Sequence, residues 1–196
     1  MTRLPSSLQP LWPLAKKVHR WSSFANGAVM RRAAPLQGER ALPRRAATTP
    51  DEVVRIAVDP TTRRIALLPL APLMHGTALT STMNALLLGG TVVVAPWARF
   101  DPARALRVMT EHRITRLVVA GDAIAIPLLD AIDEHGITEL PALESIVSSG
   151  MRFSDTTKER LHRLGRITIG DILASTEGGA LAIAITTSVD DLPSRL

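Results

Sequence analysis

The sequence predicts an α/β fold in which helices alternate with mostly parallel strands. Short continuous apolar runs, such as TVVVA at 91–95 and TRLVVA at 115–120, are typical of strands buried on both faces of a sheet. The segments between these runs have helical periodicity, and helices that separate strands favour parallel pairing with helices packed on the sheet. With 196 residues, 46% of them hydrophobic, the chain can bury the core of one domain or of part of a larger one.

Each predicted element has a local signal of its own. TALTSTMNALLL predicts a helix over 77–88, which a Gly-Gly pair ends. In FDPARALRVMTEH, Asp101 predicts an N-cap and Pro102 the first helical position, where the missing N–H costs nothing. The other predicted elements are strands at 91–95, 115–120, 143–150, 166–173 and 180–187, and helices at 100–112, 122–136 and 154–165, the last one capped by Ser154.

Charge divides the chain into a basic, Pro- and Arg-rich leader over 1–57 and an α/β domain over 58–196. Residues 1–50 carry nine Lys and Arg side chains against the single acid Glu39, whereas the rest carries 14 basic and 17 acidic side chains. Such a leader is typical of a poorly ordered segment, or of one that contacts nucleic acid, an anionic membrane surface or an acidic partner. Within it, LWPLAKKVHRW predicts a helix with one apolar face, which suits a core, a partner or a membrane surface.

Composition excludes several classes of protein. The absence of cysteine excludes disulfides, thiolate metal sites and a cysteine nucleophile. No apolar run approaches the roughly 20 residues that a membrane-spanning helix needs, so no transmembrane helix is predicted. The sequence also lacks the apolar centre of a signal peptide, which favours a cytoplasmic location.

Small and polar residues follow two of the predicted strands, where ligands bind in parallel sheets. The turn at 148–151 reads Ser-Ser-Gly-Met, and its backbone can closely approach a flat ring or a phosphate. The loop at 174–179 reads Ala-Ser-Thr-Glu-Gly-Gly and offers hydroxyls and a carboxylate. His75 lies in a third candidate segment, a Pro-rich turn before a helix. Each of these segments also fits ordinary turn chemistry, so both interpretations stay open.

In this order, the motifs resemble those of the AMP-forming acyl-CoA synthetases, adenylate-forming enzymes that activate fatty acids and related carboxylic acids. LAPLMHG resembles the family's aPLfHg motif, and LESIVSSGM resembles the strand before its adenine loop. GDILASTEGG resembles its d-x-Y/L-G-S-T/S-E signature, with Ala174 in place of the usual glycine. GDAIAIPLL is most similar to the actinobacterial branch that acts on fatty acids and sterol side chains. The resemblance runs from about Leu67 to Gly179.

The resemblance implies a ligase that uses ATP, Mg²⁺ and coenzyme A to convert a carboxylic acid, either a fatty acid or a sterol side chain, into its CoA thioester through an acyl-adenylate. It implies roles for eight residues: Gly150 and Met151 against the adenine, Asp171 and Leu173 along the edge of the nucleotide, Ser175 in contact with it, Thr176 as a hydrogen-bond donor to the phosphate, Glu177 as the Mg²⁺ ligand, and His75 near the acyl group and the coenzyme A channel. His112, His135 and His162 are expected to be structural, because they lie near predicted helix C-termini.

Parts of the family pattern are not found. The family has a Gly-, Ser- and Thr-rich phosphate loop ending in Pro-Lys, and the nearest segment here, SSFANGAV, lacks the threonines and the lysine. The chain also ends before the positions of the family's ribose-binding aspartate and of its small domain with the catalytic lysine. We therefore expect an incomplete piece of the adenylate-forming large domain, a truncated or split form that is not competent alone. Its exposed apolar surface predicts a complementing chain or a homo-oligomer.

Two other hypotheses stay open. The first is a non-catalytic α/β binding module whose basic leader contacts an acidic partner or nucleic acid, with an affinity that falls steeply as salt is added. The scarcity of aromatic residues argues against nucleic acid, since three Trp, three Phe and no Tyr are present. The second is a structural remnant that binds no ligand.

Overall fold

The computed structural model describes residues 49, 51, 54–55, 65–88, 90–95, 97, 99–175 and 179–192. Nearly all of the predicted leader, 1–57, lies outside these residues, so its helix and its partners stay predictions. In chain order the described elements are β1 (Ala66–Pro69), α3 (Gly76–Leu87), β2 (Thr91–Val92), α4 (Pro102–Glu111), β3 (Arg116–Val119), α5 (Gly121–Glu134), β4 (Ser145–Ser149), α6 (Asp155–Arg163), β5 (Thr168–Ser175), β6 (Gly179–Thr186) and the 3₁₀ helix η3 (Val189–Asp191).

One sheet in the order β2-β1-β3-β4-β5-β6 forms the centre of the described structure. All neighbouring strands from β2 to β5 are parallel, and only β5 and β6 pair antiparallel. The order places β1 in the interior of the sheet, and each parallel crossover passes through a helix, as parallel connections require. The predicted α/β fold with mostly parallel strands is confirmed.

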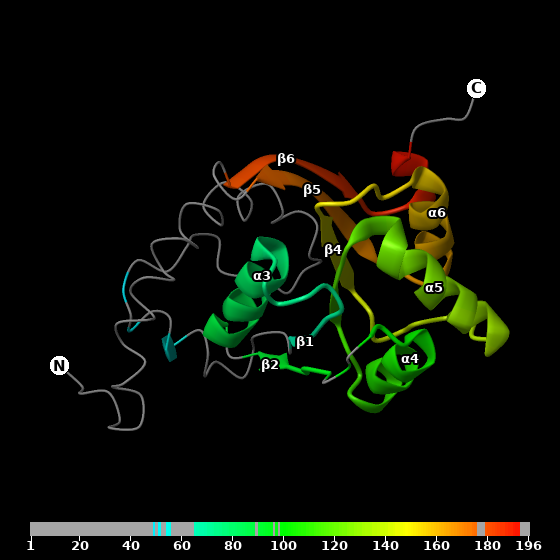
Figure 1. Ribbon diagram of the computed structural model, residues 1–196, viewed down its shortest axis with the longest axis horizontal. Helices are drawn as coiled ribbons and strands as arrows, with labels where there is room; N and C mark the ends of the chain where they lie inside the picture. Colours follow the sequence, from blue (N-terminus) through cyan, green and yellow to red (C-terminus); the bar gives the residue numbers. More distant parts are fainter. Residues whose placement is uncertain are drawn as a thin grey trace.

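The helices lie on both faces of the sheet, three on one face and one on the other. In Figure 1, α4, α5 and α6 lie together on one side and α3 lies apart from them. Neighbouring residues of β3 show the same division, because Leu117 and Val119 belong to the apolar core with α4, α5 and α6, whereas Val118 belongs to a smaller core with α3. All three side chains are at most 2% exposed. This burial on both faces explains why β3 is a continuous apolar run.

Helix boundaries follow the predicted capping residues. The side chain of Asp101 accepts a hydrogen bond from the backbone N–H of Arg104 at 3.0 Å, and Pro102 is the first residue of α4. Ser154 caps α6 in the same way, with its Oγ accepting from the backbone N–H of Thr157. Both caps satisfy N–H groups that have no partner inside the helix, so each helix begins directly after its capping residue.

The strands on one side of the sheet differ from their prediction. β1 was not predicted at all, because Pro69 interrupts an apolar run that is otherwise only a few residues long. The strand predicted at 91–95 forms a ladder only over Thr91–Val92, although the N–H of Val93 still donates to the carbonyl of Leu67 at 2.8 Å. At the opposite edge of the sheet, the antiparallel pairing of β6 agrees with the prediction of mostly parallel strands. None of these differences changes which sheet edge carries the candidate loops.

Across the described ranges, no helix is both long enough and apolar enough to span a membrane.

Candidate functional site

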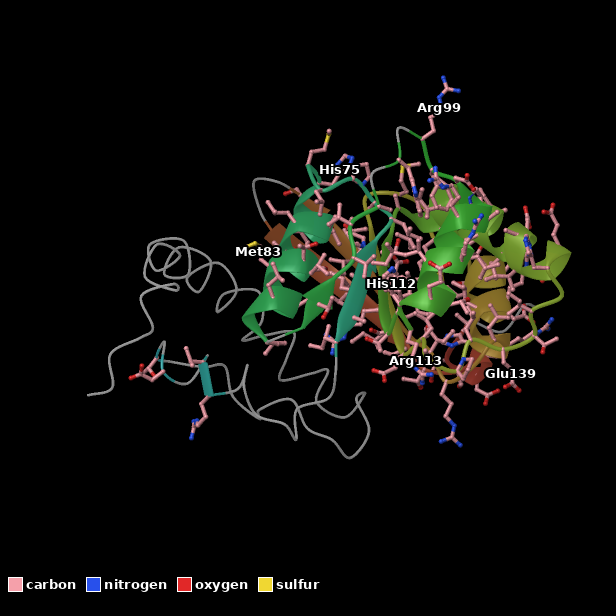
Figure 2. All side chains as sticks on the ribbon, turned by 90° about the horizontal axis from the view of Figure 1, so that it is seen from below. His75, Met83, Arg99, His112, Arg113 and Glu139 are labelled. Carbon is pink, nitrogen blue, oxygen red and sulfur yellow. The ribbon has the colours of Figure 1, made fainter. Side chains whose placement is uncertain are left out.

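The loops with the predicted site residues meet at one edge of the sheet. Because β1, β3, β4 and β5 are parallel, the segments that follow them all leave the sheet at the carboxyl end of the strands. Figure 2 shows His75 and Arg99, which follow β1 and β2, at one end of the molecule, and Arg113 and Glu139, which precede β3 and β4, at the opposite end. The fold therefore brings the turn with His75, the turn at 148–151 and the described part of the loop at 174–179 to the edge where open α/β sheets bind ligands.

The turn after β4 presents its backbone to solvent. Gly150 has φ 82°, in the left-handed region that glycine adopts without strain, and nothing lies within 4 Å of the position that a Cβ would occupy there. Met151 is 57% exposed beside it. The turn thus leaves open space on one side and an exposed apolar side chain next to it, so a flat ring can approach the backbone closely.

Hydrogen bonds from the first residues of α5 hold the same turn in place. Ser148, fully buried at the end of β4, accepts a hydrogen bond at its Oγ from the N–H of Gly121 at 3.0 Å. The N–H of Asp122 donates to the carbonyl of Arg152 at 2.8 Å, and Asp122 Oδ1 accepts from the N–H and the Oγ of Ser154, both at 3.1 Å. Sequence reasoning missed Gly121 and Asp122. Their signal was the Gly-Asp pair directly after a predicted strand.

The carboxylate of Asp171, in the middle of β5, is held by a cation from α6. Lys158 Nζ lies 2.9 Å from Asp171 Oδ2 and 3.8 Å from Asp155 Oδ1, and it is 5.4 Å from the centre of the Phe153 ring. The side chain of Lys158 is only 10% exposed and that of Asp171 27%. Asp171 was predicted to line the nucleotide. In the structure its carboxylate is engaged by Lys158, a partner that sequence reasoning did not identify because the two residues lie on different elements.

The end of β5 carries two exposed predicted residues. Leu173 is 65% exposed and Ser175 is exposed, and the pairing with β6 shifts in register between Leu173 and Ala174. Such a bulge bends the strand and re-aims its side chains, and bulges are frequent next to active sites. Thr176 and Glu177, the predicted phosphate donor and Mg²⁺ ligand, lie outside the described residues.

His75 lies at the N-cap of α3 and is exposed. Its side chain makes no capping hydrogen bond to the helix, so the cap position does not by itself explain a histidine here. The backbone carbonyl of His75 accepts from the N–H of Leu79 at 3.0 Å. The imidazole is thus accessible at the edge where the strands have their carboxyl ends, and its role near the acyl group stays a prediction.

The part of the chain that the structure describes holds no group of three or more His, Cys, Asp or Glu side chains placed to bind a metal ion. Mg²⁺ that arrives with a nucleotide is usually held by one or two carboxylates together with the phosphates of the substrate. A single carboxylate such as Glu177 fits that chemistry.

The three remaining histidines of the α/β domain lie at helix C-termini as expected. His112 and His135 are the C-caps of α4 and α5, and the ring Nδ1 of His135 is 2.8 Å from the carbonyl of Ala131. His162, in the last turn of α6, differs because it is buried, with Nε2 2.9 Å from Thr186 Oγ1. Burial lowers its pKa from the usual 6.5, outweighing the backbone of Ile167 and the charge of Asp191, which both raise it. The folded state therefore favours neutral His162.

This burial predicts a loss of stability in acid. Unfolding lets His162 bind a proton more readily, so the unfolded chain binds more protons and the free energy of unfolding should fall as the pH drops below about 6.5. Each unit of difference in pKa is worth about 1.4 kcal/mol. We expect the melting temperature of the wild type to fall between about pH 7.5 and about pH 5.5, and that of His162→Gln, which keeps a hydrogen-bonding group near Thr186, to fall less. Parallel pH profiles for both proteins would disprove this.

Comparison with known proteins gives consistent results. The sequence profile described as AMP-binding enzyme matches residues 44–195. The medium/long-chain-fatty-acid–CoA/3-oxocholest-4-en-26-oate–CoA ligase of Mycobacterium marinum is 34% identical over 113 residues, which are 57% of this chain and 20% of that protein. The 3-oxocholest-4-en-26-oate–CoA ligase of Rhodococcus rhodochrous is 32% identical over 124 residues, 60% of this chain and 22% of that protein. The chain thus spans about a fifth of the length of these relatives.

Solved structures share the fold. The N-terminal subdomain of Klebsiella oxytoca NpsA, in complex with 3-hydroxybenzoyl-AMSN, is similar with a TM-score of 0.56 and 20% identity, over 72% of this chain and 36% of that one. The N-terminal domain of FACL13 from Mycobacterium tuberculosis is similar with a TM-score of 0.54 and 22% identity, over 65% of this chain and 31% of that one. At these identities the similarity establishes the fold and no more.

Proposed function

The chain belongs to the family of AMP-binding enzymes, and from that premise we propose that it supplies the adenine side of the site of an ATP-dependent acid–CoA ligase. The observation that supports this most is the convergence of the segments after β1, β4 and β5 at one edge of the sheet, each with the residues that resemble a family motif. A turn with an open backbone, the exposed imidazole of His75 and the hydroxyl of Ser175 at the end of β5 all lie there.

The proposed reaction has two steps. A carboxylate oxygen of the acid attacks the α-phosphorus of ATP, and the bond from that phosphorus to the bridging oxygen breaks, so that an acyl-adenylate forms and pyrophosphate leaves. The thiol of coenzyme A then loses its proton and attacks the acyl carbon, forming the thioester as the bond to AMP breaks. Negative charge gathers on phosphate oxygens in the first step, so fixed hydrogen-bond donors and Mg²⁺ stabilise its transition state.

The residues of this chain take the following parts in the proposal. The adenine lies against Gly150 and Met151. Asp171, Leu173 and Ser175 lie beside the nucleotide. Thr176 donates its hydroxyl to the phosphate and Glu177 binds Mg²⁺, while His75 stands near the acyl group and the coenzyme A channel. The ligases named above act on fatty acids and on a sterol side-chain acid, so we propose an acid of one of these classes as the substrate.

The proposal includes a second chain. No phosphate loop of the family's kind is evident in the sequence. Leu173 and Leu181, near the paired ends of β5 and β6, are each 65% exposed. Apolar side chains exposed in this way are typical of a surface that packs against protein. We therefore propose that catalysis needs a complementing chain or a second copy, while nucleotide binding is the part that this chain contributes.

Ligand-induced stabilisation tests the proposal. Addition of ATP, Mg²⁺ and a medium-chain fatty acid should raise the melting temperature of the full chain, because a ligand at about 100 times its Kd adds about 2.7 kcal/mol to the free energy of unfolding. Glu177→Ala should lose the part of the shift that depends on Mg²⁺. Glu139→Ala, an exposed acid at the opposite end of the sheet, is the matched control and should shift as the wild type does.

The two failures have different meanings. If the wild type shows no shift with ATP and Mg²⁺, the proposed nucleotide binding is wrong. If the wild type and Glu177→Ala shift equally, the chain binds the nucleotide but Glu177 does not hold the metal ion.

A further inference from the structure

The start of α5 is tied to the turn after β4 by four hydrogen bonds from two consecutive residues. The N–H of Gly121 donates to Ser148 Oγ, and the N–H of Asp122 donates to the carbonyl of Arg152. The carboxylate of Asp122 accepts from both the N–H and the Oγ of Ser154. These bonds cover both ends of the turn over 149–153, so the conformation of that turn depends on α5.

Asp122 also links α5 to α6 at the N-termini of the two helices. The Oγ of Ser154 donates to Asp122 Oδ1 and accepts from the N–H of Thr157, so one hydroxyl both caps α6 and joins it to α5. Burial raises the pKa of Asp122, but hydrogen bonds from Ser154 and Thr157 and the charge of Arg152 outweigh burial, so the pKa lies below its usual value of 3.8. Asp122 is therefore ionised at neutral pH. Bonds to an ionised carboxylate are about twice as strong as those between neutral groups.

We propose that Asp122 is a positioning residue that holds the turn over 149–153 in its open, adenine-facing conformation. It does not touch the nucleotide itself. Its carboxylate holds Ser154 and its backbone N–H holds the carbonyl of Arg152. Gly150 and Met151 lie between these anchored residues and the buried Ser148, which the N–H of Gly121 holds. The adenine-binding role of the turn rests on the proposed function, whereas the mechanical role of Asp122 does not.

Hydrogen exchange followed by mass spectrometry tests the mechanical role in the full chain. In Asp122→Ala, amides in the peptide covering 149–156 should exchange about 10- to 100-fold faster, the range expected from the loss of hydrogen bonds to a charged group. Asp122→Asn keeps an oxygen that can accept from Ser154 and should restore most of the protection. Exchange at the wild-type rate in Asp122→Ala would overturn the proposal.

Asp130→Asn is the matched control. Asp130 lies on the same helix and also joins α5 to α6, since its Oδ1 is 3.1 Å from Arg160 Nη2, but its side chain is 57% exposed and Arg160 keeps a second partner in Asp133 at 2.7 Å. This control separates the loss of the Asp122 bonds from any general loosening of the contact between α5 and α6. It should leave exchange in 149–156 unchanged.

The affinity for ATP with Mg²⁺ tests whether the held turn serves the nucleotide. We expect the Kd of Asp122→Ala to rise about tenfold, and that of Asp122→Asn and Asp130→Asn to stay within about twofold of the wild type, as expected for hydrogen bonds of this strength. Faster exchange with an unchanged Kd would overturn the positioning role. If the wild type itself does not bind ATP, the proposed function fails, and the exchange rates alone decide whether Asp122 holds the turn.

Discussion

Replacing Gly121 with alanine is expected to lower the free energy of unfolding by about 3 to 5 kcal/mol, one of the largest effects that a single methyl group can have in this chain. Gly121 has φ +51°, and a Cβ added there would lie 2.1 Å from the carbonyl oxygen of Arg152 and 2.8 Å from its carbon. Backbone atoms cannot rotate away as a flexible side chain can. The turn after β4 must therefore shift, and the hydrogen bond from Asp122 to Arg152 must break or stretch.

Gly136→Ala separates crowding from backbone strain. Gly136 also has a left-handed backbone, φ +65°, but nothing lies within 4 Å of its Cβ position. Alanine there should cost only about 1 kcal/mol, the price of the left-handed conformation. Urea unfolding of the two variants measures both values. Equal losses in both would show that the close approach of Gly121 to Arg152 does not occur in solution.

The contrast between these glycines also shows what the sequence could and could not predict. Gly136 stops a helix, a local function that the spacing of apolar residues reveals, and the helix was accordingly predicted to end there. Gly121 is needed because the backbone of Arg152, about 30 residues further along the chain, passes over it. That requirement is set by the tertiary structure, and the Gly-Asp pair after the predicted strand does not reveal which distant backbone passes over it.

In the candidate site too, features with a local sequence signal could be predicted, and features set by tertiary contacts could not. The edge of the sheet and the turn at Gly150 were predictable, because strand ends follow from apolar periodicity and ligands bind at the carboxyl ends of parallel strands. The partners beneath the turn were not, because Asp122 meets Ser154 and Lys158 meets Asp171 only after the helices pack. β1 escaped prediction for a local reason: Pro69, its last residue, leaves only a short apolar run before it, and the strand is stabilised by its position between β2 and β3.

The second large effect concerns the ion pair between Lys158 of α6 and Asp171 of β5. Asp171→Ala is expected to lower the free energy of unfolding by about 2 to 4 kcal/mol, since removing one member of a buried pair leaves the other uncompensated. The Lys158 ammonium, on a side chain that is 10% exposed, would keep only Asp155, 3.8 Å away. Lys158→Met should lower the free energy of unfolding by less than about 1 kcal/mol. Methionine keeps the packing on Phe153, and the carboxylate of Asp171, which is 27% exposed, can be hydrated.

A double-mutant cycle turns this asymmetry into a test of what Asp171 does. If the carboxylate serves mainly to neutralise Lys158, the variant with both Lys158→Met and Asp171→Ala should be more stable than Asp171→Ala alone, with a coupling energy of at least about 1 kcal/mol in urea unfolding. Additive losses would contradict that role.

Because the double variant contains no unpaired buried charge, its Kd for ATP with Mg²⁺ then isolates the other role proposed for Asp171, that of lining the edge of the nucleotide. A Kd equal to that of Lys158→Met would mean that Asp171 supports β5 without touching the nucleotide, whereas a weaker affinity would place its carboxylate at the edge of the nucleotide.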